Sequence, residues 1–517
     1  MNKFLMAGCL GMLAVSMTFT SCKSDDDNND NGGGQGNETG YVWTVDGGFK
    51  ACDHILFSAE GKDDPNGTQI GNGDQNFVFN GKQTLKKGKY ILKGWVYIAK
   101  GAELTIEPGT VIMGDKQTKA ALIAERGGKL IAQGSADAPI VFTSEEAPGS
   151  RKPGDWGGVI LCGNAVMNKG EQKIEGGPRS LYGGNDDADN SGVLSYVRIE
   201  FAGYPFEKDK EINGLSLGAV GSGTKIDHVQ VSYSCDDSFE WWGGKVNCDH
   251  LIAYKGWDDD FDTDNGFSGH VQFGLVIRDP RIADGSQANG FESDNDADGS
   301  NNSPFTSAVF SNITFVGPKV VDGFQNTSDY INGGGLYPEI TPAPALGKFQ
   351  AAMQIRRNSH LNCFNSVAVG YPIGLLLDNQ KGDTQKAATD GVLKLQNLVF
   401  ADMDVLGSDA NKVYEDKRIS GYDADGNGIV DKNSTSSFSS EFFKLAANNN
   451  QYFTDKAAIG IDFTTGIPTS GSMLLKGASF TDALLSGFSK VDYIGAFAAG
   501  DTWATGWTNF DPQNTQY

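Results

Sequence analysis

Carboxylate side chains recur beside phenylalanine in short rows of this 517-residue chain. The rows are Asp237-Ser238-Phe239-Glu240, Asp259-Asp260-Phe261-Asp262, Asn289-Gly290-Phe291-Glu292 and Asp322-Gly323-Phe324-Gln325. If the phenylalanines point inward, the alternation of a β-strand turns Glu240, Asp262 and Glu292 outward. Stacked strands lie ~4.8 Å apart, so ionised carboxylates at matching positions would repel one another. Such a column favours a bound cation, a shared proton or loops that splay apart.

Three interpretations of this column remain open. The first is a solvated acidic face, the usual role of a charge run. The second is Ca²⁺ held across neighbouring strands, since oxygen ligands suit that ion. The third is catalysis by Glu240, Asp262 or Glu292, either in a glycosidase that uses two carboxylates or in a calcium-assisted polysaccharide lyase. The candidate basic partners for a lyase are Lys255, Arg278 and Arg281, and the spacing singles out no reacting pair.

A second set of side chains lies two residues after the column. The same alternation turns Trp242, Asp264 and Asp294 outward and Trp241 inward. An exposed indole beside polar loops can stack on a sugar ring. We therefore predict that Trp242, Asp264 and Asp294 contact a ligand, with Trp242 as the strongest candidate.

A separate motif has the spacing of a calcium loop of the EF-hand or dockerin type. Its predicted ligands are Asp423, Asp425, Asn427, the backbone carbonyl of Ile429, and Asp431. Gly428 stands at the position that needs a sharp turn. Ser434 stands where an EF-hand has its bidentate glutamate. The motif predicts structural Ca²⁺, with a solvated Asx-turn loop as the alternative.

A second repeating column predicts the fold. Its members are Tyr196, His228, His250, His270, Asn312 and Asn397, each within a short alternating strand. Short strands at variable intervals, with the extra length in Gly/Asp/Asn loops, are typical of a solenoid. His and Asn tolerate the left-handed backbone of a corner, so we expect corners rather than a zinc site at the three histidines. The sequence predicts an all-β parallel β-helix in which each coil extends the previous hydrogen-bond ladder.

The chain divides into six predicted segments. They are a signal peptide (1–21), an acidic and Gly-rich flexible tether (22–40), an N-terminal cap (41–82), the β-helix (83–410), the calcium-type loop insertion (411–438) and a C-terminal cap on the last coil (439–517). The start of the chain resembles a bacterial lipoprotein signal, which implies cleavage before Cys22 and acylation of that thiol. The alternative is an ordinary signal peptide with an incidental cysteine. The tether resembles the surface-export signal of Bacteroidota lipoproteins, and a solvated spacer on a periplasm-facing protein is its alternative.

The charge and the cysteines limit the partners. The formal net charge is −23. An anionic surface repels phosphate backbones and anionic polysaccharides and attracts cations, so we expect no nucleic-acid partner. Five cysteines remain after Cys9 and Cys22, and no CxxC pair suggests zinc or redox chemistry. Cys235 and Cys248 flank one turn of the repeat and could meet as a disulfide.

Several longer motifs resemble a family of Bacteroidota outer-surface lipoproteins. They are 104–112 (LTIEPGTVI), 154–160 (GDWGGVI), 197–203 (VRIEFAG), 256–262 (GWDDDFD), 493–497 (YIGAF) and 506–512 (GWTNFDP). The resemblance implies a right-handed β-helix on an acylated anchor in the outer membrane, exposed at the cell surface. It implies no settled activity.

These observations predict a lipid-anchored β-helix that binds an extracellular ligand without catalysis. A carbohydrate captured beside an outer-membrane receptor is the expected ligand, and Ca²⁺ is expected to stiffen the loops. The alternatives are a polysaccharide lyase or glycosidase on the same scaffold, and a structural surface-layer component.

Overall fold

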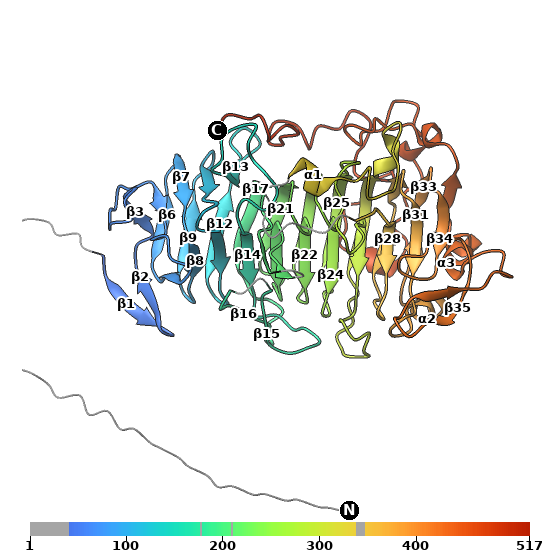
Figure 1. The fold of residues 1–517 in the computed structure, drawn as a ribbon, viewed down its shortest axis with the longest axis horizontal. Helices are drawn as coiled ribbons and strands as arrows, with labels where there is room; N and C mark the ends of the chain where they lie inside the picture. Colours follow the sequence, from blue (N-terminus) through green and yellow to red (C-terminus); the bar gives the residue numbers. More distant parts are fainter. Residues whose placement is uncertain (1–40, 176–177, 208–209, 338–346) are drawn as a thin grey trace, which may run out of the picture. The chain divides into compact units, whose positions relative to one another are not determined.

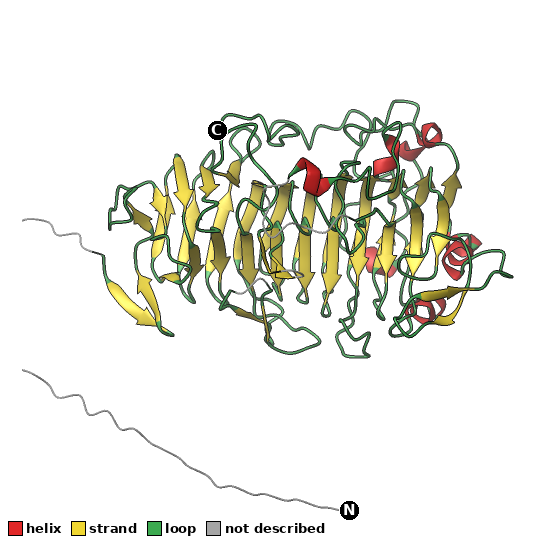
Figure 2. Ribbon diagram, in the orientation of Figure 1, coloured by secondary structure: helices red, strands yellow, loops and turns green. Residues whose placement is uncertain are grey.

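The computed structural model describes residues 41–175, 178–207, 210–337 and 347–517 (Figure 1). The predicted signal peptide and tether, with Cys22, lie outside these residues. Strands and loops make up nearly all of the described chain, and helices are few and short (Figure 2). The α-helices are α1 (Gly333–Leu336), α2 (Thr384–Thr389) and α3 (Phe438–Phe443). Within the described part, every helix is too short or too polar to cross a bilayer.

One wall of the fold is a 13-stranded sheet. In spatial order its strands are β1 (Trp43–Asp46), β2 (Phe49–Cys52), β5 (Phe77–Phe79), β8 (Trp95–Ile98), β11 (Ala121–Ala124), β14 (Gly158–Cys162), β20 (Leu215–Gly218), β22 (Phe239–Trp242), β24 (Phe261–Asp264), β26 (Phe291–Ser293), β28 (Ala351–Ile355), β31 (Ile373–Leu377) and β34 (Val405–Ser408). Only β1 runs antiparallel to its neighbour. We call this wall the first sheet.

The other walls belong to an 18-stranded second sheet. Its N-terminal strands are β3 (Leu56–Phe57), β4 (Gln69–Ile70), β6 (Lys82–Leu85), β7 (Lys89–Leu92), β9 (Glu103–Ile106), β10 (Val111–Gly114), β12 (Lys129–Gln133) and β13 (Ile140–Ser144). The long central strands are β17 (Gly192–Glu200), β21 (Lys225–Ser232), β23 (Asn247–Tyr254), β25 (His270–Ile277) and β27 (Val309–Val316). The C-terminal strands are β29 (Asn362–Phe364), β30 (Val367–Val369), β32 (Leu395–Gln396), β33 (Val399–Ala401) and β37 (Gln451–Phe453).

Each long strand of the second sheet bends at one residue. The first half of β17 pairs with β12 and the second half with β13, so β17 crosses from one wall to the next. The residue at the bend has a left-handed backbone, with φ of 52° at Tyr196, 51° at His228 and 54° at His250. A coil therefore has three walls, and the predicted parallel β-helix is confirmed.

The corner prediction is correct for most members of the column and wrong for His270. Asn312 and Asn397 also have positive φ. The register pairs Cys248 with Val271, which places Phe273, with φ of 59°, beside His250. His270 lies three residues earlier and packs on Phe488, with ring centroids 4.9 Å apart. The sequence around His270 resembles that of the other corners, but the loop before β25 shifts the register by three residues.

The stacked phenylalanines fill the centre of the coils. Phe239, Phe261 and Phe291 are register partners with no exposed surface, and successive ring centroids lie 5.6 and 5.8 Å apart. The prediction that Phe324 is the fourth member of this stack is wrong. The register partner of Phe291 is Met353, whereas Phe324 packs on Phe349 in a cluster outside the stacked strands.

The stacking extends into the predicted N-terminal cap. Strand β2 pairs in parallel with β5, and β5 with β8, so β2 and β5 already belong to the first sheet, while β3 and β4 between them belong to the second sheet. At the other end, α3 packs on β34, as a cap would. Strand β37 extends the ladder of β33.

The predicted C-terminal cap is wrong for the segment that follows β37. Residues 454–517 run back along the second sheet toward β13, over many coils rather than the last one (Figure 1). Trp507 and Trp503 pack against the corner histidines, with centroid distances of 5.7 Å to His228 and 4.8 Å to His250.

Side chains at or near the corners also hold the backbone of this tail. Side-chain amides of Gln230, Asn312 and Asn397 donate to carbonyl oxygens of Asn509, Tyr493 and Gly477 at 2.7–2.9 Å. The tail therefore packs along the coils from β17 to β33, where the corner residues are aromatic or polar.

The remaining strands form hairpins outside the coils. These are β15 (Gln172–Lys173) with β16 (Leu181–Tyr182), β18 (Pro205–Glu207) with β19 (Lys210–Glu211), and β35 (Ile419–Tyr422) with β36 (Gly428–Val430).

Candidate functional site

The predicted carboxylate column exists on the outer side of the first sheet. Glu240 is the register partner of Asp262, and Asp262 that of Glu292. The column begins after Ser216 and ends before Gln354, which are the register partners on the adjacent strands. The acidic stretch therefore spans three consecutive strands, β22, β24 and β26.

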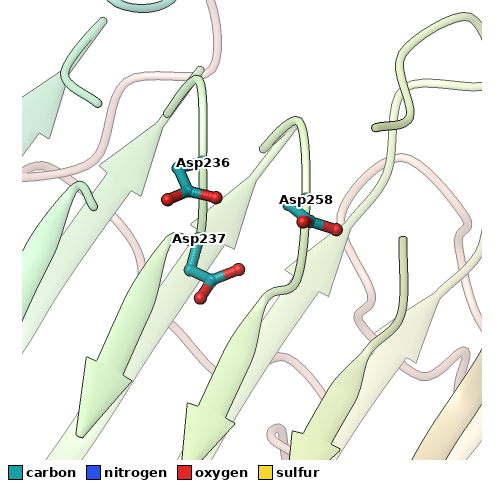
Figure 3. Close-up of side chains that lie close together, drawn as sticks. All are labelled: Asp236, Asp237 and Asp258. Atoms are coloured by element: carbon teal, nitrogen blue, oxygen red, sulfur yellow. The ribbon is translucent and has the colours of Figure 1, made fainter. Parts of the chain in front are cut away.

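Loop carboxylates join this column at the edge where the strands begin. One oxygen each from Asp237, Glu240 and Asp262 lie within 4.8 Å of one another. A second group, Asp236, Asp237 and Asp258, meets the same criterion on the loops before β22 and β24 (Figure 3). We call these five side chains the acidic trench. Asp237 belongs to a predicted row, whereas Asp236 and Asp258 lie outside the predicted site residues. The Asp-Asp pairs before both strands are the sequence signal for that edge.

Backbone and amide groups fix parts of the trench. Asp237 accepts a hydrogen bond from the backbone N–H of Asp259 at 2.9 Å, and Asp258 accepts one from the Ser286 hydroxyl at 2.7 Å. The Asn213 amide donates to Glu240. Among the described residues, the buried polar atoms without a hydrogen-bond partner include Oδ1 of Asn213, Asp258 and Asp262. Buried acceptors without donors are costly, and a cation would satisfy them.

Burial and mutual repulsion shift the pKa values of the trench. Burial raises the pKa of Asp237, Glu240 and Asp262 well above the usual range, and neighbouring carboxylates raise it further. The pKa of Asp264 rises to about 7, first by burial and then through Asp294. Without a cation these shifts favour the protonated forms of the carboxyls.

Arginines neutralise the far end of the column. Arg356 pairs with Glu292, and its Nε lies 2.9 Å from Asp294. Arg357 lies 2.5 Å from the other oxygen of Asp294. Glu292 and Asp294 are thus occupied by ion pairs, whereas Asp237, Glu240 and Asp262 have no ion pair among the described contacts.

The predicted basic partners for a lyase are engaged elsewhere. The Arg278 side chain is fully buried, 2.9 Å from Asp260, and donates to the Asp258 carbonyl at 2.7 Å. Arg281 donates to the Tyr330 carbonyl at 2.7 Å, and Lys255 lies 3.7 Å from Asp279.

Trp242 is not the exposed contact that alternation predicted. It points away from the coil centre, but only 6 % of its surface is exposed. Tyr182 of β16 packs against it, with ring centroids 5.9 Å apart. The hairpin between β14 and β17 covers the indole, and the alternation of a strand carries no information about such a cover. Trp241 is fully buried, as predicted.

The predicted calcium loop is the turn of the β35–β36 hairpin. The Asp423 carboxylate accepts the backbone N–H groups of Asp425 and Asn427 at 2.9 and 2.8 Å, which is an Asx-turn arrangement. Asp425 is exposed, as is Ile429, and the Asp431 side chain accepts the backbone N–H of Asn433. Calcium at this hairpin stays a prediction.

The suggested disulfide is absent from the structure. Cys235 and Cys248 are buried thiols in different apolar clusters. Cys248 packs inside the coils, whereas Cys235 packs on the outside with the tail, so the wall of the coil separates them.

The stacked parallel coils place the chain in the class of parallel β-helix proteins. A family model described as a pectate-lyase-like β-helix domain matches residues 78–451, and the chain belongs to this family. No curated protein and no solved structure matches the chain.

Proposed function

We propose that the protein binds an acidic extracellular polysaccharide through a divalent cation held in the acidic trench. The cation would be Ca²⁺, because every candidate ligand is a hard oxygen. Asp237, Glu240 and Asp262 would be its protein ligands.

One observation carries this proposal: three carboxylates share a site, and none of them forms an ion pair among the described residues. Ca²⁺–oxygen distances are 2.3–2.6 Å, so oxygens on opposite sides of the ion lie about 5 Å apart. The 4.8 Å limit on the three carboxylates fits that span. At such a separation two ionised carboxylates repel by about 3.5 kcal/mol at an effective dielectric constant of 20. A cation removes that repulsion and satisfies the orphaned oxygens of Asn213 and Asp262.

The ligand class follows from the coordination number. Ca²⁺ takes six to eight oxygens, and three carboxylates leave several positions for water or for a sugar carboxylate. An acidic polymer would otherwise be repelled by this face, so the cation would act as the bridge. Membership in a pectate-lyase-like family supports a polysaccharide ligand.

Binding is favoured over cleavage because the basic side chains near the trench are committed. Arg278 is locked to Asp260, and Arg356 to Glu292 and Asp294. The second candidate is a calcium-assisted polysaccharide lyase, which the family match favours. A two-carboxylate glycosidase is the weaker alternative. The spacing is near the ~5–5.5 Å of a retaining pair, but such a pair needs one ionised nucleophile, and burial raises the pKa of both Glu240 and Asp262.

The cellular setting of the proposal comes from the sequence. Acylation at Cys22 would anchor the protein in the outer membrane, exposed at the cell surface, where an outer-membrane receptor could take up a captured glycan. A structural surface-layer role predicts self-association without a glycan.

Titration of polygalacturonate and alginate into the purified protein tests the proposal. Binding should occur with Ca²⁺, weaken at least tenfold with chelator, and weaken equally in Glu240→Gln. Asp322→Asn, at a fully exposed carboxylate, serves as the matched control. Ultraviolet absorbance of unsaturated products separates lyase turnover from binding alone, and calcium-independent binding to both polymers would contradict the proposal.

A further inference from the structure

A cavity lies at the opposite end of the first sheet from the C-terminal coils. It has a volume of about 680 Å³ and is bounded by β1, by β2 and by the loops that carry Asp63 and Asp74. Pockets of this size hold small ligands. It lies at the strands that begin the stack, whereas the acidic trench lies on β22 and β24.

Trp43 forms an aromatic wall of this cavity. Its indole N–H donates to Asp63 at 3.0 Å, so its polar atom is already satisfied. Phe57 and Phe77 support the ring, with centroids 6.2 and 6.0 Å away. The indole is 38 % exposed, so an oriented apolar face remains for a ligand. Val45, which is 77 % exposed, extends the apolar surface along the same strand.

Polar groups surround this wall. Asp63 and Asp74 are exposed carboxylates. The Asn72 amide donates to Asp74 at 3.0 Å, which holds both groups at the rim. Lys50 lines the same cavity. The cavity thus combines one rigid aromatic face with acceptors and donors at its edge.

We propose that this cavity binds a neutral sugar residue of a glycan. The apolar face of a pyranose packs on an indole, and its hydroxyl groups match carboxylate, amide and ammonium partners. Two carboxylates against one ammonium disfavour a uronate, so the expected ligand carries no charge. This site needs no cation and stands independently of the acidic trench.

The test uses the intact protein in chelator with neutral hexasaccharides of β-1,4-glucan, β-1,4-mannan and β-1,4-galactan. Saturation-transfer NMR and tryptophan fluorescence measure binding. At least one probe should bind, Trp43→Ala should weaken binding about tenfold, and Trp43→Phe should weaken it less. Asp74→Ala changes an exposed side chain and should also weaken binding, which keeps the test decisive if Trp43→Ala disturbs the fold. Val321→Ala, at an exposed residue far along the chain, should bind as the original protein does.

Several outcomes would overturn the inference. One is the absence of binding to every neutral probe. Another is binding that neither Trp43→Ala nor Asp74→Ala weakens. A third is a Trp43-dependent change in molecular mass by light scattering without glycan binding, which would assign the surface to a second copy. Neutral-glycan binding in a protein that ignores polygalacturonate would support this site while rejecting the trench proposal.

Discussion

Glu240 and Asp262 are direct register partners on adjacent parallel strands, and their carboxylate oxygens lie within 4.8 Å of each other. Like charges opposite each other destabilise a sheet. This pair therefore lowers stability unless a proton or a cation intervenes. The pair destabilises the fold without a cation, and a bound cation would make it stabilising.

Asp262→Asn should separate stability from cation binding. In chelator the free energy of unfolding of the variant should be about 1–2 kcal/mol higher than that of the original protein, because one of the mutually repelling carboxylates is gone. With Ca²⁺ its affinity should fall at least tenfold, because a ligand is lost. Denaturant titration and calorimetry measure the two effects. Asp322→Asn is the control, and a variant that loses stability in chelator would contradict the repulsion argument.

The pH dependence of stability should have a definite sign. Unfolded carboxyls titrate near 4, whereas the pKa of folded Asp264 is raised to about 7, chiefly by burial. Between these values the folded state holds more protons, so stability in chelator should fall as pH rises from about 4 to about 7. Burial and neighbouring carboxylates also raise the pKa of Glu240 and Asp262, so the double variant Glu240→Gln/Asp262→Asn should show a shallower fall. Equal slopes in both proteins would assign the titration to groups outside the trench.

Calcium should counteract that loss. Because Ca²⁺ requires ionised ligands, its stabilising effect should grow as pH rises and follow the ratio of free Ca²⁺ to its dissociation constant. Thermal unfolding at pH 5 and pH 8, with and without Ca²⁺, measures this. A calcium effect that is larger at pH 5 would contradict it.

Trp507→Ala should release the C-terminal tail. Trp507 is fully buried against Tyr196 and His228, and truncation of such a side chain costs about 3–5 kcal/mol. Hydrogen exchange should accelerate in residues 454–517 while the coils stay protected, since the coils have their own ladders. Leu445→Ala, at an exposed residue, is the control. Simultaneous loss of protection in the coils would show that the tail is part of the cooperative core.

Arg278→Met should be strongly destabilising. It leaves buried Asp260 without its 2.9 Å partner, and loss of one member of a buried pair costs about 3–5 kcal/mol. The double variant Arg278→Met/Asp260→Leu should recover much of that stability by removing both charges. Chemical denaturation measures the free energy of unfolding of both variants. A double variant no more stable than the single variant would show that the lost stability comes from packing and not from the unpaired charge.

The sequence was sufficient to predict the stacked coils. Phe239, Phe261 and Phe291 each lie in a short alternating strand and are each followed by an acidic residue. This local pattern alone places them in one column. The predicted positions of Phe324 and His270 are wrong because loops of different length separate the strands. A segment whose sequence matches the repeat can therefore lie outside the register.

The site was predictable only in part for a related reason. Alternation fixed which side of the sheet Glu240 and Asp262 face. Alternation could not show that a hairpin covers Trp242, that Arg356 forms an ion pair with Glu292, or that the C-terminal tail packs along the corners of the coils. Those contacts join segments separated by dozens to hundreds of residues, and no local period encodes them.

Diffraction from crystals grown with Ca²⁺, and with Mn²⁺ for its anomalous signal, tests the cation directly. We expect one density peak bonded to oxygens of Asp237, Glu240 and Asp262, with Ca²⁺–oxygen distances of about 2.3–2.6 Å. A trench whose carboxylates hydrogen-bond to one another at saturating Ca²⁺, with no peak between them, would contradict the account.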